Sequence, residues 1–335
     1  MLLVRWVFLL LLALLVVFGP TILPPYYVNL ATRVLIFALF AMSLDLLLGY
    51  TGLWSFGHAA FFGFAAYGVG LFTLRVQNNV ILAVLTSLTA TLLLAALFGL
   101  LSLRARGVYF MMLTLALAQV VWGVAFKWRS FTGGDDGLPA IPRPDLSPLP
   151  LKAANSVDFY IFTAVIFIIA VSILFLITRS PFGASLEGIR EHETRMIVLG
   201  YNVWLHRYLA HLFAALFAGV AGVLFAYHNG IVSPIDLSVV RSAEALLMVV
   251  LGGAGTLFGP VFGALVVELL KHFVSIYTER WLAILGLIYV ITVLVAPNGI
   301  YEAIQRLFRF RVAPSSNLAP SDHRMRRWIL LLRRR

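Results

Sequence analysis

The sequence predicts an all-α, polytopic membrane protein with about ten transmembrane helices, some of them short or broken. Hydrophobic residues make up 61% of the 335 residues and charged residues only 12%. The mean hydropathy is +0.97. Soluble domains are about half apolar and about one quarter charged. This chain has too little polar surface to cover itself in water, so we expect lipid to be its main solvent.

Ten apolar segments approach the length of a membrane-spanning helix, which is about 20 residues. The first resembles the core of a signal peptide, but no small-residue cleavage site follows it, so we interpret it as a retained span. The eighth is short. The segments are Leu2–Phe18, Val28–Leu48, Gly57–Leu74, Val80–Leu103, Gly107–Phe126, Asp158–Ile177, Leu205–Tyr227, Val239–Gly252, Gly259–Tyr277 and Trp281–Ala296.

The net charge of +11 reflects a basic C-terminal tail. A cytoplasmic tail on anionic lipid explains this charge more simply than nucleic-acid binding does. Ten spans then place the N-terminus inside as well, together with the loops around Arg104 and around Arg190. Nine of the 25 basic residues lie in the tail, namely Arg306, Arg309, Arg311, Arg324, Arg326, Arg327, Arg333, Arg334 and Arg335.

Several kinds of chemistry have no signature in this sequence. There is no cysteine, which excludes disulfides and thiolate metal sites. None of the three lysines follows a glycine, so there is no Walker A sequence, and no pair of residues has zinc-protease spacing. We therefore expect no catalytic residue, metal or cofactor on this chain. Any ATP-driven work requires another polypeptide.

A glycine-rich segment, Gly49–His58, separates the second and third spans. Irregular backbone at membrane depth is tolerated only where protein or a water-filled cavity satisfies its polar groups. The segment therefore predicts a broken, translocation-related element, although an ordinary turn with closely packed glycines also fits. The candidates for the pathway here are Asp45, Gly49, Thr51, Gly52, Ser55 and His58.

A second glycine-rich segment, Leu251–Pro260, precedes the ninth span in the comparable position, which indicates two halves of the same orientation. Its pathway candidates are Gly252, Gly253 and Gly255, and Glu244 lies nearby in the eighth span. Ionisable residues within spans are costly and should face the bundle interior. Glu268 and Lys271 are three residues apart and can pair. The ionisable residues within spans are Arg33, Asp45, His211, Glu244, Glu268 and Lys271.

Two polar connections are longer than the rest. Lys127–Val157 combines glycines, aspartates and five prolines, which predicts an external loop that can contact a partner. Arg179–Arg207 begins with Ser180-Pro181, a typical helix start, and contains Gly200, a typical helix end. Leu186, Ile189, Ile197 and Gly200 fall near one face, so this loop predicts a short amphipathic helix.

Five blocks in this order resemble branched-chain amino acid ABC transporter permeases of the LivM type. The first carries the Gly49–His58 segment, the fourth is similar to the cytoplasmic coupling loop of that family, and the resemblance extends from about Tyr27 to Tyr301. The loop departs from the family by its bulk at Arg195 to Val198. The blocks are Ser43–Gly63, Arg106–Ala116, Thr132–Leu138, Ser180–Asn202 and Leu251–Pro260.

The resemblance implies a non-catalytic subunit in the cell inner membrane. It implies a heterodimer with a second homologous permease, two cytoplasmic ATP-binding subunits that use ATP, and a periplasmic substrate-binding protein. Residues 1–310 would form the permease domain, with a coupling loop at 179–207, and residues 311–335 the cytoplasmic tail. The implied docking residues for the ATPase are Arg190, Glu191, Glu193 and Gly200.

Two alternatives remain open on the sequence. Permeases for urea or amides share these blocks, and no residue distinguishes them. A secondary transporter or channel that works alone also has broken helices and intramembrane carboxylates. The amphipathic loop at 180–202 favours the ATP-driven class, because a solitary carrier does not need it.

Overall fold

The computed structural model describes residues 24–77, 79–144 and 155–277, with single positions between 283 and 299. The regular elements in these ranges are helices, which confirms the all-α prediction, and Leu138 and Val232 form an isolated β-bridge. The long helices are α2 (Pro25–Asp45), α3 (His58–Arg75), α4 (Val80–Ser102), α5 (Val108–Lys127), α7 (Ser156–Arg179), α10 (Val203–Asn229), α11 (Val239–Gly252) and α12 (Gly259–Tyr277).

These eight helices correspond to the second to ninth predicted spans. The first predicted span lies outside the described residues, as do most of the tenth and the tail at 311–335. Among the described residues, five helices are long and apolar enough to cross a membrane: α2 with its C-terminal extension to Tyr50, α4, α5, α7 and α10. The chain is a multi-pass membrane protein.

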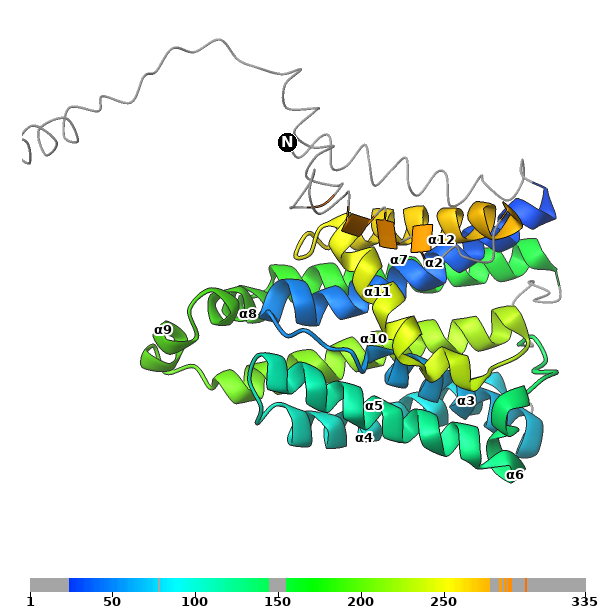
Figure 1. Cartoon of the computed structure of the whole chain (residues 1–335), viewed down its shortest axis with the longest axis horizontal. Coiled ribbons are helices and arrows are strands. Elements are labelled where there is room, and N and C mark those ends of the chain that lie inside the picture. Colours follow the sequence, from blue (N-terminus) through cyan, green and yellow to red (C-terminus); the bar gives the residue numbers. More distant parts are fainter. Residues whose placement is uncertain are drawn as a thin grey trace, which may run out of the picture.

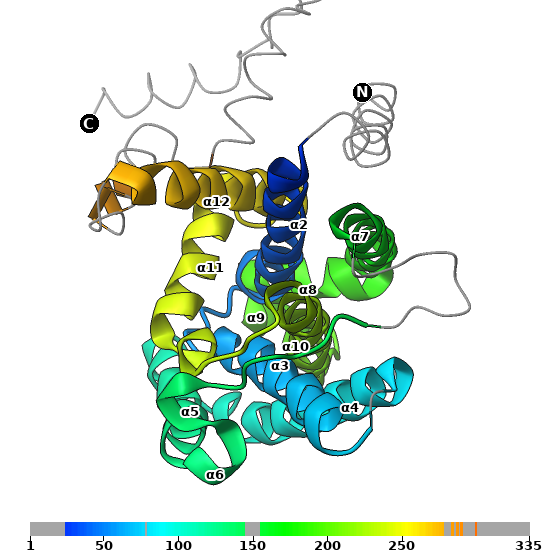
Figure 2. The same cartoon turned by 90° about the vertical axis from the view of Figure 1, so that its right-hand side faces the viewer.

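Helices α2 and α10 are the most buried of these five helices. In Figure 2, α10 and α3 lie in the middle of the bundle, and α2 lies between α12 and α7 next to them. In their most apolar windows, 78% of α2 and 72% of α10 is buried, against 22% to 28% for α4, α5 and α7. The outer helices therefore present apolar side chains to their surroundings, as lipid requires.

Glycines on facing helices allow neighbouring helices of the bundle to approach closely. A Cβ atom at Gly222 of α10 would overlap the carbonyl of Phe62 on α3. A Cβ atom at Gly263 of α12 would overlap the carbonyl of Met248 on α11. These two backbone contacts fix how deeply α10 and α12 pack against their neighbours.

The polar connections separate to the two ends of the bundle (Figure 1). At one end lie the short helices α8 (Pro181–Glu191) and α9 (Glu193–Val198), and Arg106 forms an ion pair with Glu193 there. At the other end lie α6 (Arg129–Thr132) and the turn η2 (Gly134–Asp136). The loops predicted to share the cytoplasmic side thus do lie together.

A buried ion network joins α11, α12 and the 3₁₀ turn η3 (Pro234–Leu237). The Arg241 guanidinium donates to Asp236 Oδ1 at 2.8 Å and to Glu244 Oε2 at 2.7 Å. Lys271 Nζ donates to the other Glu244 oxygen at 2.9 Å. The guanidinium also lies over the rings of Phe37 and Phe225. A separate pair, Arg33–Glu268 at 3.3 Å, connects α2 with α12.

Replacing Arg241 with methionine should destabilise the isolated subunit by about 3–5 kcal/mol, because it strips a buried cation from two buried carboxylates. The measurement is the thermal unfolding midpoint in detergent. Arg195→Met is the matched control, since Arg195 is exposed on α9 and has no ion pair within the described ranges. Equal midpoints for the two variants would show that the network contributes nothing to stability.

Candidate functional site

The first glycine-rich segment begins where α2 changes from an α-helix to a π-helical turn, η1 (Leu46–Tyr50). The last α-helical residue, Asp45, is completely buried. Thr51 donates its hydroxyl to the carbonyl of Leu47 at 2.5 Å. π-Helical turns occur frequently at functional sites because they displace the backbone that follows.

Residues 52–57 continue without regular structure until α3 starts at His58. Ser55 is completely buried, and its hydroxyl has no partner within the described residues. Gly52 is exposed and has a φ of +71°, a left-handed conformation that favours glycine. The prediction of a broken element between the second and third spans is therefore confirmed.

His58 attaches the start of α3 to α2. Its Nε2 lies 2.8 Å from Ser43 Oγ, and the Ser43 hydroxyl donates to the carbonyl of Phe40 at 2.6 Å. Because a hydroxyl has one proton to donate, we infer that His58 Nε2–H is the donor in the first contact. The imidazole also stacks on Phe40. This geometry gives His58 a positioning role beside the segment.

The second glycine-rich segment folds back against the first. Thr256 donates its hydroxyl to the carbonyl of Gly253 at 2.6 Å and accepts from the amide of Gly259 at 3.1 Å. The amide of Gly255 donates to Asp45 Oδ1 at 2.7 Å. The sequence placed these two segments at comparable positions, and the structure brings them into direct contact.

The contact between the two segments requires glycine at position 49. A Cβ atom there would overlap both Asp45 Oδ1 and the backbone amide of Gly255. At Gly252, a Cβ atom would overlap the carbonyl of Gly259, which keeps the second segment tightly folded. We call the contact of Asp45, Gly49 and Gly255 the glycine junction.

The predicted amphipathic helix is two helices. Ser180 caps α8, its Oγ accepting from the amide of Gly183 at 3.4 Å, and Pro181 is the first residue of α8, as predicted. The chain breaks at His192, which has a φ of −148° and a ψ of 81°. This break shifts the helical register, so Met196 is buried, whereas Ile197, which we expected on the buried face, is 53% exposed.

The four predicted docking residues differ in their surroundings. Arg190, Glu191 and Gly200 are exposed. Glu193 forms ion pairs with Arg106 at 3.3 Å and with Arg207 at 3.1 Å, so it connects α9 to two neighbouring segments. The Arg190 guanidinium donates through Nη1 to the carbonyl of Gly49, at the glycine junction.

Glu244 is the predicted pathway residue that lies apart from the junction. It is eight residues from Gly252 along α11, about 12 Å at the helical rise, and belongs to the ion network with Arg241 and Lys271. The ion pairs of Lys271 and Glu268 also join different helices, since Glu268 pairs with Arg33. Glu268 and Lys271, which the sequence indicated could pair within one helix, thus also link that helix to its neighbours.

Thr256 and Asp236 are among the polar residues that the sequence analysis did not single out, as is Arg241 at the centre of the ion network. Thr256 follows the glycines of Gly-Gly-Ala-Gly-Thr, where a hydroxyl can replace missing helical hydrogen bonds. Asp236 lies in the sequence Ser-Pro-Ile-Asp, and its carboxylate accepts from the amide of Ser233 at 3.1 Å, a capping arrangement. Both signals were present in the sequence as local capping patterns.

A multi-pass helical bundle with two broken segments in contact, next to short helices exposed at one end, has the architecture of a membrane permease. The family model for the permease component of the branched-chain amino acid transport system matches residues 26–296. The chain belongs to this family.

Two curated relatives have the name "High-affinity branched-chain amino acid transport system permease protein LivM". They come from Salmonella typhimurium and Escherichia coli K12. Each is 27% identical to this chain, over 82% of this chain and 69% of the relative. No solved structure matches this chain.

Adding one methyl group at the junction should destabilise the protein. We expect Gly49→Ala to lower the stability of the isolated subunit by about 1–3 kcal/mol, because its Cβ atom meets Asp45 and backbone that cannot move away easily. Gly123→Ala on α5 is the matched control, since a Cβ atom there meets nothing within 4 Å. The readout is the unfolding midpoint in detergent. A Gly49→Ala midpoint equal to that of the control would contradict the proposed packing.

Proposed function

We propose that this chain is the membrane-spanning permease subunit of an ABC importer that carries branched-chain amino acids across the cytoplasmic membrane. Separate ATPase subunits would supply the energy, and the chain itself would have no catalytic activity and bind no cofactor. The family, the two LivM relatives and the missing Walker A sequence support this proposal. The observation that carries it is the contact of a helix at one end of the bundle with the first broken segment, through the hydrogen bond from Arg190 to the carbonyl of Gly49, which lies beside Gly255 of the second segment.

The ATPases would dock on α8 and α9. Ile197, Val198 and Leu199 lie in succession there and are 53%, 81% and 65% exposed. Apolar side chains at the aqueous end of a bundle are favourable only when a partner covers them. Glu191 and Gly200, which are also exposed, would lie at the rim of this surface. The exposed Ile197 and Val198 belong to the segment, Arg195 to Val198, in which the sequence departs from its family.

Substrate would pass beside the glycine junction. Its polar lining candidates are Asp45, Thr51, Ser55 and His58, and its backbone candidates are the glycines at 49, 52, 252, 253 and 255. Asp45 Oδ2 and the Ser55 hydroxyl are buried without a partner in the described residues. Polar groups of this kind can offer hydrogen bonds to a small polar solute when the junction opens.

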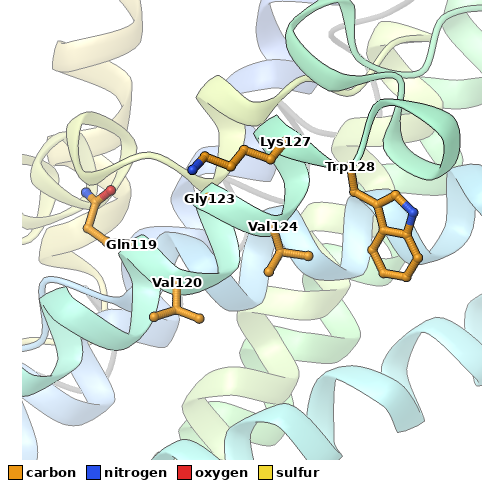
Figure 3. A pocket seen from close by; sticks show the side chains of 6 residues that line it. All are labelled: Gln119, Val120, Gly123, Val124, Lys127 and Trp128. Atoms are coloured by element: carbon orange, nitrogen blue, oxygen red, sulfur yellow. The ribbon is translucent and has the colours of Figure 1, made fainter.

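A second, homologous permease would cover α5. The helix exposes one face along Tyr109, Met112, Ala116, Gln119 and Gly123. Figure 3 shows part of this face, a shallow hollow in which the Gln119 amide and the Lys127 amine extend outwards. An amide facing hydrocarbon is costly, whereas small residues and an amide are typical of helix–helix interfaces in membranes. A partner helix packed on this face would shield the amide from hydrocarbon and would fill the space beside the small residues.

The end with α8 and α9 would face the cytoplasm, which places both termini inside and the protein in the cell inner membrane. The opposite end would meet the periplasmic binding protein. There the chain from Gly133 to Pro144 crosses the bundle and pairs with the start of η3 through Leu138 and Val232. The exposed Asp135 and Asp136 would be available to a partner at this end.

Reconstitution tests the proposal directly. Proteoliposomes that contain this chain, its second permease and its ATPases should take up leucine only with ATP and the binding protein present, and dissipating ion gradients should have no effect. Competition by isoleucine and valine supports the branched-chain assignment, whereas competition by urea or acetamide alone supports the amide alternative. Uptake by this chain alone, driven by an ion gradient, would show a secondary transporter instead.

The docking surface can be tested by introducing one negative charge on α9. Val198→Asp should reduce co-purification of the ATPase at least tenfold, because an ionised carboxylate would be buried without a partner in the interface. Val76→Asp is the matched control, since Val76 is 70% exposed near the opposite end. Undiminished co-purification with Val198→Asp would exclude α9 from the interface.

The permease interface calls for a steric test. Gly123→Trp should weaken co-purification of the second permease several-fold by filling the hollow on α5. Leu93→Trp on α4 is the control, because Leu93 is 73% exposed and a larger apolar side chain there faces lipid. If both variants retain the partner equally, another face of the chain forms the dimer.

A further inference from the structure

Arg190 is the residue at which α8, the first broken segment and the second broken segment meet. Its Nη1 donates to the carbonyl of Gly49. A Cβ atom at Gly52 would lie 3.0 Å from Arg190 Cγ, and a Cβ atom at Gly255 would lie 3.1 Å from Nη1. The side chain therefore extends along the first segment and ends between the two segments.

Gly49 needs such a donor. It lies in the π-helical turn, before irregular backbone that cannot continue the helical hydrogen bonds. A carbonyl at membrane depth without a donor is costly. A guanidinium carries several donors in a rigid fork, so it can satisfy this carbonyl while its stem stays on α8.

The rest of the junction is held by few polar contacts. Asp45 accepts a hydrogen bond from Gly255 through Oδ1, the amide of Leu257 and the charge of Arg190 also act on its carboxylate, and its Oδ2 has no partner in the described residues. Asp45 is nonetheless fully buried. A junction with one satisfied and one unsatisfied carboxylate oxygen should be sensitive to the loss of any further contact.

We propose that Arg190 is a positioning residue that transmits displacement of α8 to the glycine junction and keeps the two segments packed together. This inference depends on the proposed function for the source of the displacement, an ATPase that moves α8 and α9. Arg190 is itself exposed on α8, but the role assigned to it is its contact with the broken segments of the permease, whereas the exposed α9 residues make the docking contact. When α8 moves away, Gly49 loses its donor and the two segments separate.

The packing part of the proposal can be tested without any partner. The chain has no cysteine, so Ser55→Cys introduces a single buried thiol of nearly unchanged shape. In proteoliposomes of the full chain, a membrane-impermeant methanethiosulfonate reagent should modify this thiol at least fivefold faster in Arg190→Ala than with Arg190 present. Arg195→Ala, an exposed arginine in the same loop, should leave the rate within twofold.

Equal rates with Arg190→Ala and Arg195→Ala would overturn the proposal. If Arg190→Ala lowers the yield of folded protein, Arg190→Lys replaces it, because lysine keeps the charge but lacks the guanidinium fork. A rate at least doubled by Arg190→Lys supports the proposal, and a smaller change overturns it.

The transmission part requires the complete transporter. With Arg190→Ala, the ATPases should still co-purify and hydrolyse ATP within twofold of the original rate, while leucine taken up per ATP hydrolysed falls at least tenfold. An unchanged ratio, or dissociation of the ATPases, would overturn the role of Arg190 in transmission. If the unmodified transporter shows no ATP-driven uptake, the proposed function fails, and the thiol labelling still decides the packing role.

Discussion

The hydrogen bond between the Gly255 amide and the buried Asp45 carboxylate is the interaction on which the broken centre of this protein depends. Hydrocarbon offers no hydrogen bonds, so backbone that leaves a helix at membrane depth must find its partners inside the protein. Here, two segments that are 210 residues apart supply partners for one another. The π-helical turn and glycine at position 49 bring their backbones close enough, and Arg190 satisfies a carbonyl of the same turn.

The two polar clusters of the bundle each contain a buried polar atom without a partner in the described residues, which in the ion network is Arg241 Nε. In the ion network, Arg241 bonds two carboxylates and Glu244 accepts from two cations. At the glycine junction, Asp45 Oδ2 has no partner among the described residues. Helix α11 carries the network near its start and Gly252 at its end. The start of α11 is therefore held by ion pairs, and its end is held by close backbone packing at Gly252.

Local patterns predicted those features whose causes are local. Apolar length identified the spans, glycine content identified both broken segments, and Ser180-Pro181 identified the start of α8. The sequence could not reveal that Glu268 pairs with Arg33, because that pair depends on how α2 and α12 are rotated and shifted relative to each other. It also placed Ile197 on the buried face, because a helical pattern assumes an unbroken helix and His192 interrupts it. The role of Arg190 was hidden for the same reason: its partner lies 141 residues away.

The exposed end of α9 bears on whether such a protein works alone. A solitary carrier gains nothing from three successive apolar residues at the aqueous end of its bundle, since they raise the cost of exposure and favour aggregation. Ile197, Val198 and Leu199 follow Glu193 after three intervening residues, and the ion pairs of Glu193 with Arg106 and Arg207 hold α9 in place. A firmly held apolar surface is costly unless a partner covers it. In the proposed function, a partner on this surface would reach the glycine junction through α8 and the hydrogen bond from Arg190 to Gly49.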